Sequence, residues 1–154
     1  MTWTRALCGI AVVIGVLSAS GASAQLLPSC TISVTSVNFG NYNVFNGTAV
    51  DSTGTITYRC NATAVNITIT LSKGQSSTYN PRTMTKGGET LDYNLYTNAG
   101  RTSIWGDGTS GTSVYSRVNP PNNDVNVTIY GRVPAAQDVS AGSYSDTVSA
   151  TINF

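Results

Sequence analysis

The 154-residue sequence contains no histidine. Without an imidazole base, neither a Ser-His nor a Cys-His dyad can form, which excludes the hydrolases that depend on such a dyad. The sequence also lacks a Gly-x-Ser-x-Gly motif, and it lacks a glycine-rich phosphate-binding loop followed by a helix. We therefore do not expect this protein to be an enzyme.

Charged residues are also scarce, at 10% of the sequence. Without Arg5, which lies in the N-terminal apolar region, the basic and acidic residues balance, so no basic face is available for nucleic acid or an anionic membrane. A glycosidase would need two carboxylates in one cleft, whereas acids scattered over loops and strand faces are more often solvated. The acidic residues are Asp51, Glu89, Asp92, Asp107, Asp124, Asp138 and Asp146.

Only one apolar run is long enough to have a targeting role. Residues 6–17 follow the basic Arg5 and precede the small residues Ala22-Ser23-Ala24, which is the pattern of a signal peptide and its cleavage site. The run is shorter than the roughly 20 residues that a spanning helix needs, and no second run follows. We expect residues 1–24 to be removed on export and residues 25–154 to form one domain without direct membrane insertion.

Two cysteines, Cys30 and Cys60, remain in the mature chain. In an exported protein an even cysteine count favours a disulfide, here closing a loop of about 30 residues and contributing roughly 3–4 kcal/mol in the chain-entropy model. Metal ligation is the alternative. Because the chain has no histidine and no further mature cysteine, we expect neither a metal nor another cofactor.

The mature chain reads as short alternating strands separated by turn residues, with no segment of helical period. This pattern predicts an all-β sandwich. A change of parity between Val34 and Val37 predicts a bulge near Thr35-Ser36. Segments 40–54, 73–90 and 134–141 are expected to be loops. The expected strands are 31–39, 55–60, 65–71, 91–96, 114–118, 125–131 and 144–154.

The last expected strand has one apolar and one polar face. Its apolar face carries Tyr144, Val148, Ala150, Ile152 and Phe154. At a sheet edge, such a strand would present unpaired backbone groups beside an apolar face and would accept a strand from another chain. Alternatively, it is an internal strand of a complete sandwich.

The order and spacing of short segments over nearly the whole mature chain resemble the spore coat protein U domain family, which also includes subunits of archaic chaperone–usher pili. The segments that carry the resemblance are Cys30–Ile32, Asn38–Tyr42, Ile56–Cys60, Leu71–Gly74, Arg82–Met84, Leu91–Tyr96, Trp105–Gly108, Tyr130–Pro134, Gly142–Asp146 and Ile152–Phe154.

The resemblance implies an incomplete immunoglobulin-like β-sandwich that lacks its final strand. In pilus members, a periplasmic chaperone lends a strand to the gap, and a neighbouring subunit later replaces it. The implied partners are therefore a periplasmic pilus chaperone, an outer-membrane usher and neighbouring subunits, and the implied destination is the cell surface, in a pilus or spore coat. The terminal apolar face described above would then line the strand-acceptor groove.

A self-contained secreted module that binds polysaccharide is the alternative function. Trp105 and the eight tyrosines of the sequence could stack on sugar rings, although aromatic residues of a small sandwich more often pack in its core.

Overall fold

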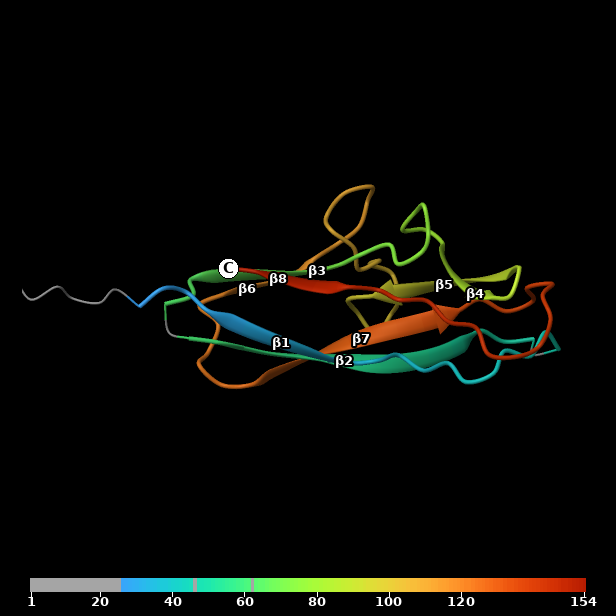
Figure 1. Cartoon of the computed structure of the whole chain (residues 1–154), viewed down its shortest axis with the longest axis horizontal. Helices are drawn as coiled ribbons and strands as arrows, with labels where there is room; N and C mark the ends of the chain where they lie inside the picture. Colours follow the sequence, from blue (N-terminus) through green and yellow to red (C-terminus); the bar gives the residue numbers. More distant parts are fainter. Residues whose placement is uncertain (1–25, 46, 62) are drawn as a thin grey trace, which may run out of the picture.

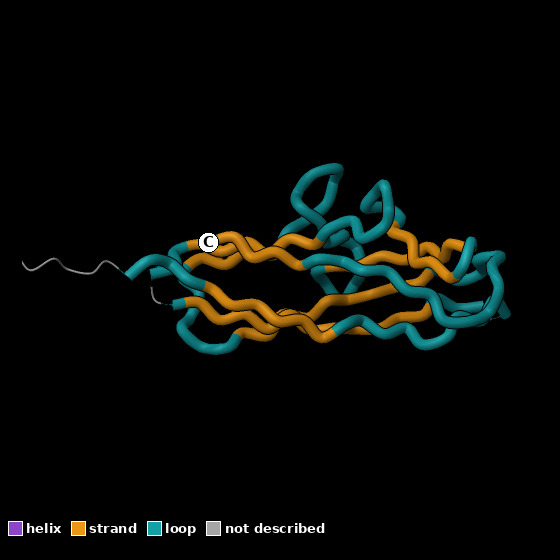
Figure 2. Tube along the Cα trace, viewed as in Figure 1, coloured by secondary structure: helices purple, strands orange, loops and turns teal. Residues whose placement is uncertain are grey.

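The computed structural model describes residues 26–45, 47–61 and 63–154 (Figure 1). The signal peptide expected at residues 1–24 lies outside them. None of the described residues is helical, so this part of the chain holds no helix that could cross a membrane. Strands and loops instead form two antiparallel sheets that face each other, as the tube in Figure 2 shows. The all-β, immunoglobulin-like sandwich is confirmed.

The larger sheet has five strands in the order β1-β2-β7-β5-β4, and the smaller sheet has three in the order β6-β3-β8. Their bounds are β1 Cys30–Thr35, β2 Val50–Cys60, β3 Asn66–Leu71, β4 Arg82–Lys86, β5 Glu89–Tyr96, β6 Tyr115–Val118, β7 Val125–Val133 and β8 Ala150–Asn153. The larger sheet curls, so that β4 and β5 lie level with the smaller sheet (Figure 1). The outermost strands β1 and β8 thus belong to opposite sheets.

The core follows from period-two alternation on the inner faces of both sheets. On β3, Ile67 and Ile69 are buried, and on β2, Ile56 is buried in the same apolar cluster. Trp105 is fully buried among them, and its indole N–H donates to the Ile69 carbonyl at 2.9 Å. Trp105 therefore packs inside the sandwich and cannot serve in a sugar-stacking platform, contrary to that hypothesis.

Cys30 and Cys60 lie opposite each other in the β1–β2 ladder, and the structure joins them in a disulfide. Replacing both by alanine is expected to lower the free energy of unfolding by roughly 3–4 kcal/mol, because the cross-link restricts the unfolded chain. Denaturant unfolding measures this loss. Thiol labelling with and without reductant is the companion test, and free thiols in the unreduced exported protein would contradict the pairing.

Two strands differ from the sequence-based expectation. β4 lies inside the segment 73–90 that was expected to be a loop, and it forms a hairpin with β5 through Gly87 and Gly88. The alternation was obscured because one of its two inward positions holds Arg82, which is fully buried. β2 begins at Val50, five residues earlier than expected, and this first half pairs only with β7.

After Thr35 the chain leaves the β2 edge. The change of parity between Val34 and Val37 occurs at the predicted position. Its cause is that the chain leaves the larger sheet after Thr35, so the predicted bulge is wrong. Val37 and Phe39 turn inward over two glycines, Gly54 and Gly131: a Cβ on Gly54 would lie 2.9 Å from Val37, and one on Gly131 would lie 2.6 Å from Phe39. Only glycine permits this close approach.

The expected strand 144–154 is a regular strand only over β8. Upstream, Ser145 forms an isolated bridge with Thr85 of β4, whereas β8 pairs with β3. The C-terminal segment therefore passes from the edge of one sheet to the edge of the other. Its pairing partner is β4 at Ser145 and β3 from Ala150 onward.

Candidate binding groove

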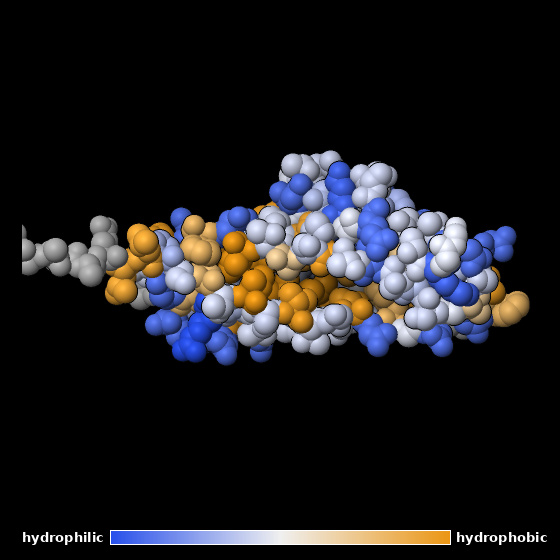
Figure 3. Space-filling view, viewed as in Figure 1, coloured by the Kyte–Doolittle hydropathy of each residue, from blue (hydrophilic) through white to orange (hydrophobic). Residues whose placement is uncertain are grey.

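An apolar groove of about 360 Å³ lies between the chain that follows β1 and the chain that precedes β8. In the space-filling view, apolar side chains fill this hollow along the middle of the molecule, between paler polar rims (Figure 3). The groove therefore lies where the two sheets fail to meet, between the first and last strands of the domain.

The C-terminal wall carries three of the five residues expected to line a groove. Tyr144, Val148 and Ala150 lie along it. Ile152 is instead paired opposite Ile69 in the β3–β8 ladder and packs against the core. Phe154 is 55% exposed beyond the end of β8.

The N-terminal wall was not predicted from the sequence as part of a groove. It is formed by Val34 and by the chain from Ser36 to Tyr42, including the inward-turned Val37 and Phe39. Val34 is 51% exposed, although it lines an apolar surface. The change of parity between Val34 and Val37 was the available indication, because it marks where the chain stops pairing with β2.

Inner-face residues from three strands, β4, β5 and β7, and from the end of β3 form the floor. They are Leu71, Met84, Leu91, Tyr93, Leu95, Ile129 and Val133. All are buried within the domain, yet each contributes surface to the groove. An occupant would therefore complete the packing of residues that already belong to the core.

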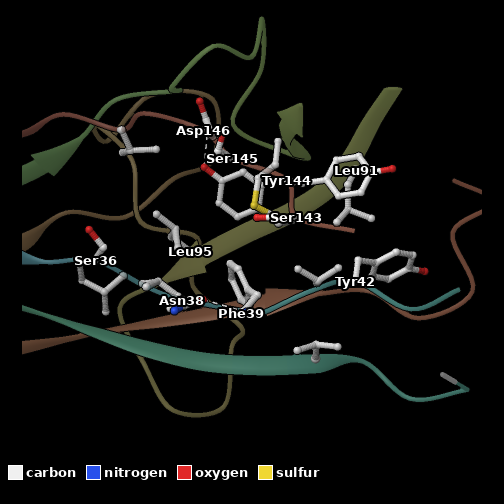
Figure 4. Close-up of a pocket in the computed structure, with 18 of the residues that line it drawn as sticks. Ser36, Asn38, Phe39, Tyr42, Leu91, Leu95, Ser143, Tyr144, Ser145 and Asp146 are labelled. Carbon is white, nitrogen blue, oxygen red and sulfur yellow. Dashed lines mark hydrogen bonds between the residues drawn. The ribbon is translucent and has the colours of Figure 1, made fainter. Parts of the chain in front are cut away.

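Contacts of Tyr93 connect Phe39 with Asp146, and both of these residues are labelled in the close-up of the groove (Figure 4). The Phe39 ring packs edge-on against Tyr93, with centroids 6.0 Å apart. The Tyr93 hydroxyl donates to the Asp146 carboxylate at 2.6 Å. Burial and then the Asp146 carboxylate raise the pKa of Tyr93 above its ordinary value, so this hydroxyl stays protonated and keeps donating.

Asp146 also fixes the C-terminal wall to the loop after β3. Its carboxylate accepts from the backbone N–H of Gln75 at 2.8 Å. A Cβ on Gly74 would lie 2.0 Å from the same carboxylate, so only glycine fits there. Asp146 thus replaces an apolar residue on the inward face at the point where the segment changes sheets.

The backbone along the groove is largely unpaired. Within the ranges that the structure describes, residues 36–41 make no backbone–backbone hydrogen bond with another segment. On the opposite wall, Ser145 and Ser149 bond to β4 and to Ser72 respectively, on the side away from the groove. An apolar floor between two unpaired backbone edges is the environment that a β-strand requires.

Among the described residues, no three His, Cys, Asp or Glu side chains lie close enough together to hold a metal ion. Asp146 is the one acidic residue in the described lining of the groove, and its oxygens accept hydrogen bonds from Tyr93 and Gln75. The groove is thus an apolar surface bordered by two stretches of largely unpaired backbone.

Taken together, the two sheets and the unfilled position between β1 and β8 define an immunoglobulin-like sandwich that is open along one edge. A family model, the Spore Coat Protein U domain, matches residues 16–151. The chain belongs to the Spore Coat Protein U domain family.

Two individual proteins are similar to the chain. It is 35% identical over 132 residues to Protein U of Myxococcus xanthus, a match that covers 77% of this chain and 71% of that protein. It also resembles a chain in the CsuC–CsuE chaperone–tip adhesion subunit pre-assembly complex from archaic chaperone–usher Csu pili of Acinetobacter baumannii, with 26% identity and a TM-score of 0.60. That match covers 84% of this chain but only 40% of the solved one.

Proposed function

We propose that this protein is an exported structural or adhesive subunit of a surface pilus or coat, which assembles by accepting a β-strand from another protein. The observation that carries this proposal is the apolar groove between the chain after β1 and the chain before β8. Family membership and the similarity to a chain of a chaperone–tip subunit complex support it. In this reading the sandwich is incomplete, and the occupant supplies its missing strand.

The shape of the groove specifies an extended occupant. The two walls run in opposite directions, since Tyr42 near the end of one pairs antiparallel with Gly142 at the start of the other. An inserted strand would therefore lie antiparallel to one wall and parallel to the other. Alternate side chains would point at the apolar floor, while the backbone would bond to either wall.

Assembly through this groove needs two successive occupants. We propose that a periplasmic pilus chaperone first lends a strand and that a neighbouring subunit replaces it at an outer-membrane usher. Each large apolar side chain left unburied would otherwise cost the domain roughly 1.5–3 kcal/mol. The expected signal peptide at residues 1–24 would deliver the chain to the periplasm before it reaches the cell surface.

The proposed function is structural and includes no chemical step. Its specificity lies in the match between the apolar pattern of the donor strand and the floor. The polysaccharide-binding alternative loses its central aromatic, because Trp105 is fully buried.

A matched pair of variants tests the groove directly. Val34→Asp places a charge on its wall, whereas Val118→Asp places the same charge on β6 of the other sheet. Both valines are exposed, at 51% and 68%, so both variants should fold. Val34→Asp is expected to weaken binding of a peptide with alternating apolar residues by tenfold or more, because an inserted strand would bury the new charge.

Isothermal titration of each folded variant with the same peptide measures this difference. Val118→Asp should bind like the unmodified domain. Equal affinity of all three proteins would place the binding site elsewhere, and no binding to any of them would remove the proposed function.

A further inference from the structure

We propose that the junction between Tyr42 and Gly142 is a stop that limits how far an inserted strand can enter the groove and thereby sets its register. The inference rests on the proposed strand-accepting function and concerns the regulation of that same site. Its basis is that the two walls are joined by backbone hydrogen bonds at one end of the groove and lie apart along the rest of it.

The junction closes the groove with main-chain bonds. The Tyr42 N–H donates to the Gly142 carbonyl at 2.8 Å, and the Gly142 N–H donates to the Tyr42 carbonyl at 3.0 Å. Both residues therefore use the groove-facing donor and acceptor on each other. A strand could pass between them only if both bonds were broken.

Gln137 holds the N-terminal side of the junction. Its backbone N–H donates to the Tyr42 hydroxyl at 2.9 Å, and that hydroxyl donates to the Gln137 carbonyl at 3.2 Å. The Gln137 side chain in turn bonds to both backbone groups of Asp92 on β5, at 2.7 and 2.9 Å. Tyr42 is thus fixed to the larger sheet through a residue that lies far from it in sequence.

Lys86 holds the C-terminal side. Its ammonium donates to the Ala141 carbonyl at 2.7 Å and to the Ser140 hydroxyl at 2.9 Å. Gly142 has a φ of +146° and lies so close to Lys86 that a Cβ there would be 2.8 Å from the ammonium nitrogen. Ser140 also bonds to Glu89, and these bonds hold the pKa of the Glu89 carboxyl below its ordinary value.

The opposite end of the groove has no comparable closure among the residues that the structure describes. There β1 and β8 are the outer strands of different sheets and are not paired with each other. A strand would therefore enter beside β8 and advance toward the junction. On this side the groove lining runs from Ser143 to Ala150, and the edge of β8 continues it to Asn153. Together they comprise 11 residues, or about 37 Å at about 3.4 Å per residue.

A stop of this kind solves a problem that apolar alternation leaves open. A slip of one residue would turn the polar face toward the floor, so alternation excludes it. A slip of two residues keeps the same face inward, and the apolar floor would accept it. The junction removes every register in which the strand extends beyond Ser143.

The experiment is a length series in the full domain. Alternating strands of about 7, 9, 11, 13 and 15 residues are fused after Phe154 through a flexible turn, and hydrogen exchange is measured along each. Protection is expected to extend to about the eleventh residue and no further, with at least tenfold faster exchange beyond it. The unfolding midpoint should rise with length and then stay constant.

Gln137→Ala removes the side-chain bonds behind the junction, and Asn122→Ala is the control at an exposed amide residue between β6 and β7, away from the groove. The first variant should extend protection past the limit by at least tenfold at the added residues, and the second should not. If Gln137→Ala fails to fold, the length series in the domain without this substitution still tests the stop. Protection that continues to the fifteenth residue would overturn the proposed stop but leave the proposed strand-accepting function standing. Absence of protection at every length would overturn the proposed function itself.

Discussion

A domain with an 11-residue alternating strand fused after Phe154 is expected to be about 4 kcal/mol more stable than the unfused domain. Each large apolar side chain buried on the floor contributes roughly 1.5–3 kcal/mol, and the entropy lost in ordering the strand offsets part of the sum. The unfolding temperature should therefore rise by more than about 10 °C. Calorimetry of both proteins measures the difference.

The matched control is the same strand shifted by one residue, so that its polar residues face the floor and its apolar residues face solvent. Composition and length are unchanged, but the register places the wrong side chains inward. This shifted fusion should unfold at the same temperature as the unfused domain. Equal stabilisation by both fusions would mean that the added chain does not occupy the groove.

Replacing Arg82 by methionine is expected to lower the free energy of unfolding by about 3 kcal/mol or more. The guanidinium is fully buried and donates to the carbonyls of Ser72 and Trp105 and to the side chain of Asn94, at distances from 2.6 to 3.1 Å. Methionine fills a similar volume but leaves the Ser72 and Trp105 carbonyls without a donor, whereas the Asn94 oxygen keeps only the Leu95 N–H. Each orphaned buried group costs roughly 1–3 kcal/mol.

Arg117→Met is the control, because Arg117 is exposed on β6 and its loss should change stability by less than about 0.5 kcal/mol. Urea unfolding of both variants gives the two values. A small effect at both positions would show that the Arg82 bonds add nothing beyond packing. Burial lowers the pKa of Arg82, but arginine retains its charge at neutral pH.

Strands with strict alternation were predictable from the sequence. β3, β5 and β7 lie where apolar residues recur at every second position, because each has one face in the core. β4 was not predictable in this way. Its inward Arg82 satisfies its hydrogen bonds through residues distant in sequence, and period-two patterning cannot reveal such partners.

The groove was predictable on one side only. Tyr144, Val148 and Ala150 were identified as an apolar face beside unpaired backbone, and they line the C-terminal wall. The N-terminal wall depends on the approach of Val37 and Phe39 to glycines of β2 and β7. That approach is a tertiary contact, and the sequence indicated only that the parity changes near it.

Asp146 explains why the terminal strand was predicted to be too long. Alternation from Tyr144 to Phe154 is interrupted at this position, which accepts bonds from Tyr93 and Gln75 where the chain moves between sheets. A continuous strand can carry one polar residue on its apolar face, so the sequence pattern alone did not indicate an interruption at Asp146. Its bonding partners became known only from the structure, in which β8 begins at Ala150, where pairing with Leu71 of β3 begins.

Hydrogen exchange of the unmodified domain, with and without a free alternating peptide, tests strand acceptance most directly. Residues 36–41 and 143–149 lie in the two walls. The N–H groups of Gly40, Ser145, Thr147 and Ser149 already donate hydrogen bonds within the domain. The other amides of both walls that face the groove should exchange at least tenfold more slowly when the peptide is bound, because they gain backbone partners. Unchanged exchange at both walls would contradict strand acceptance, as would protection confined to the free edge of β6.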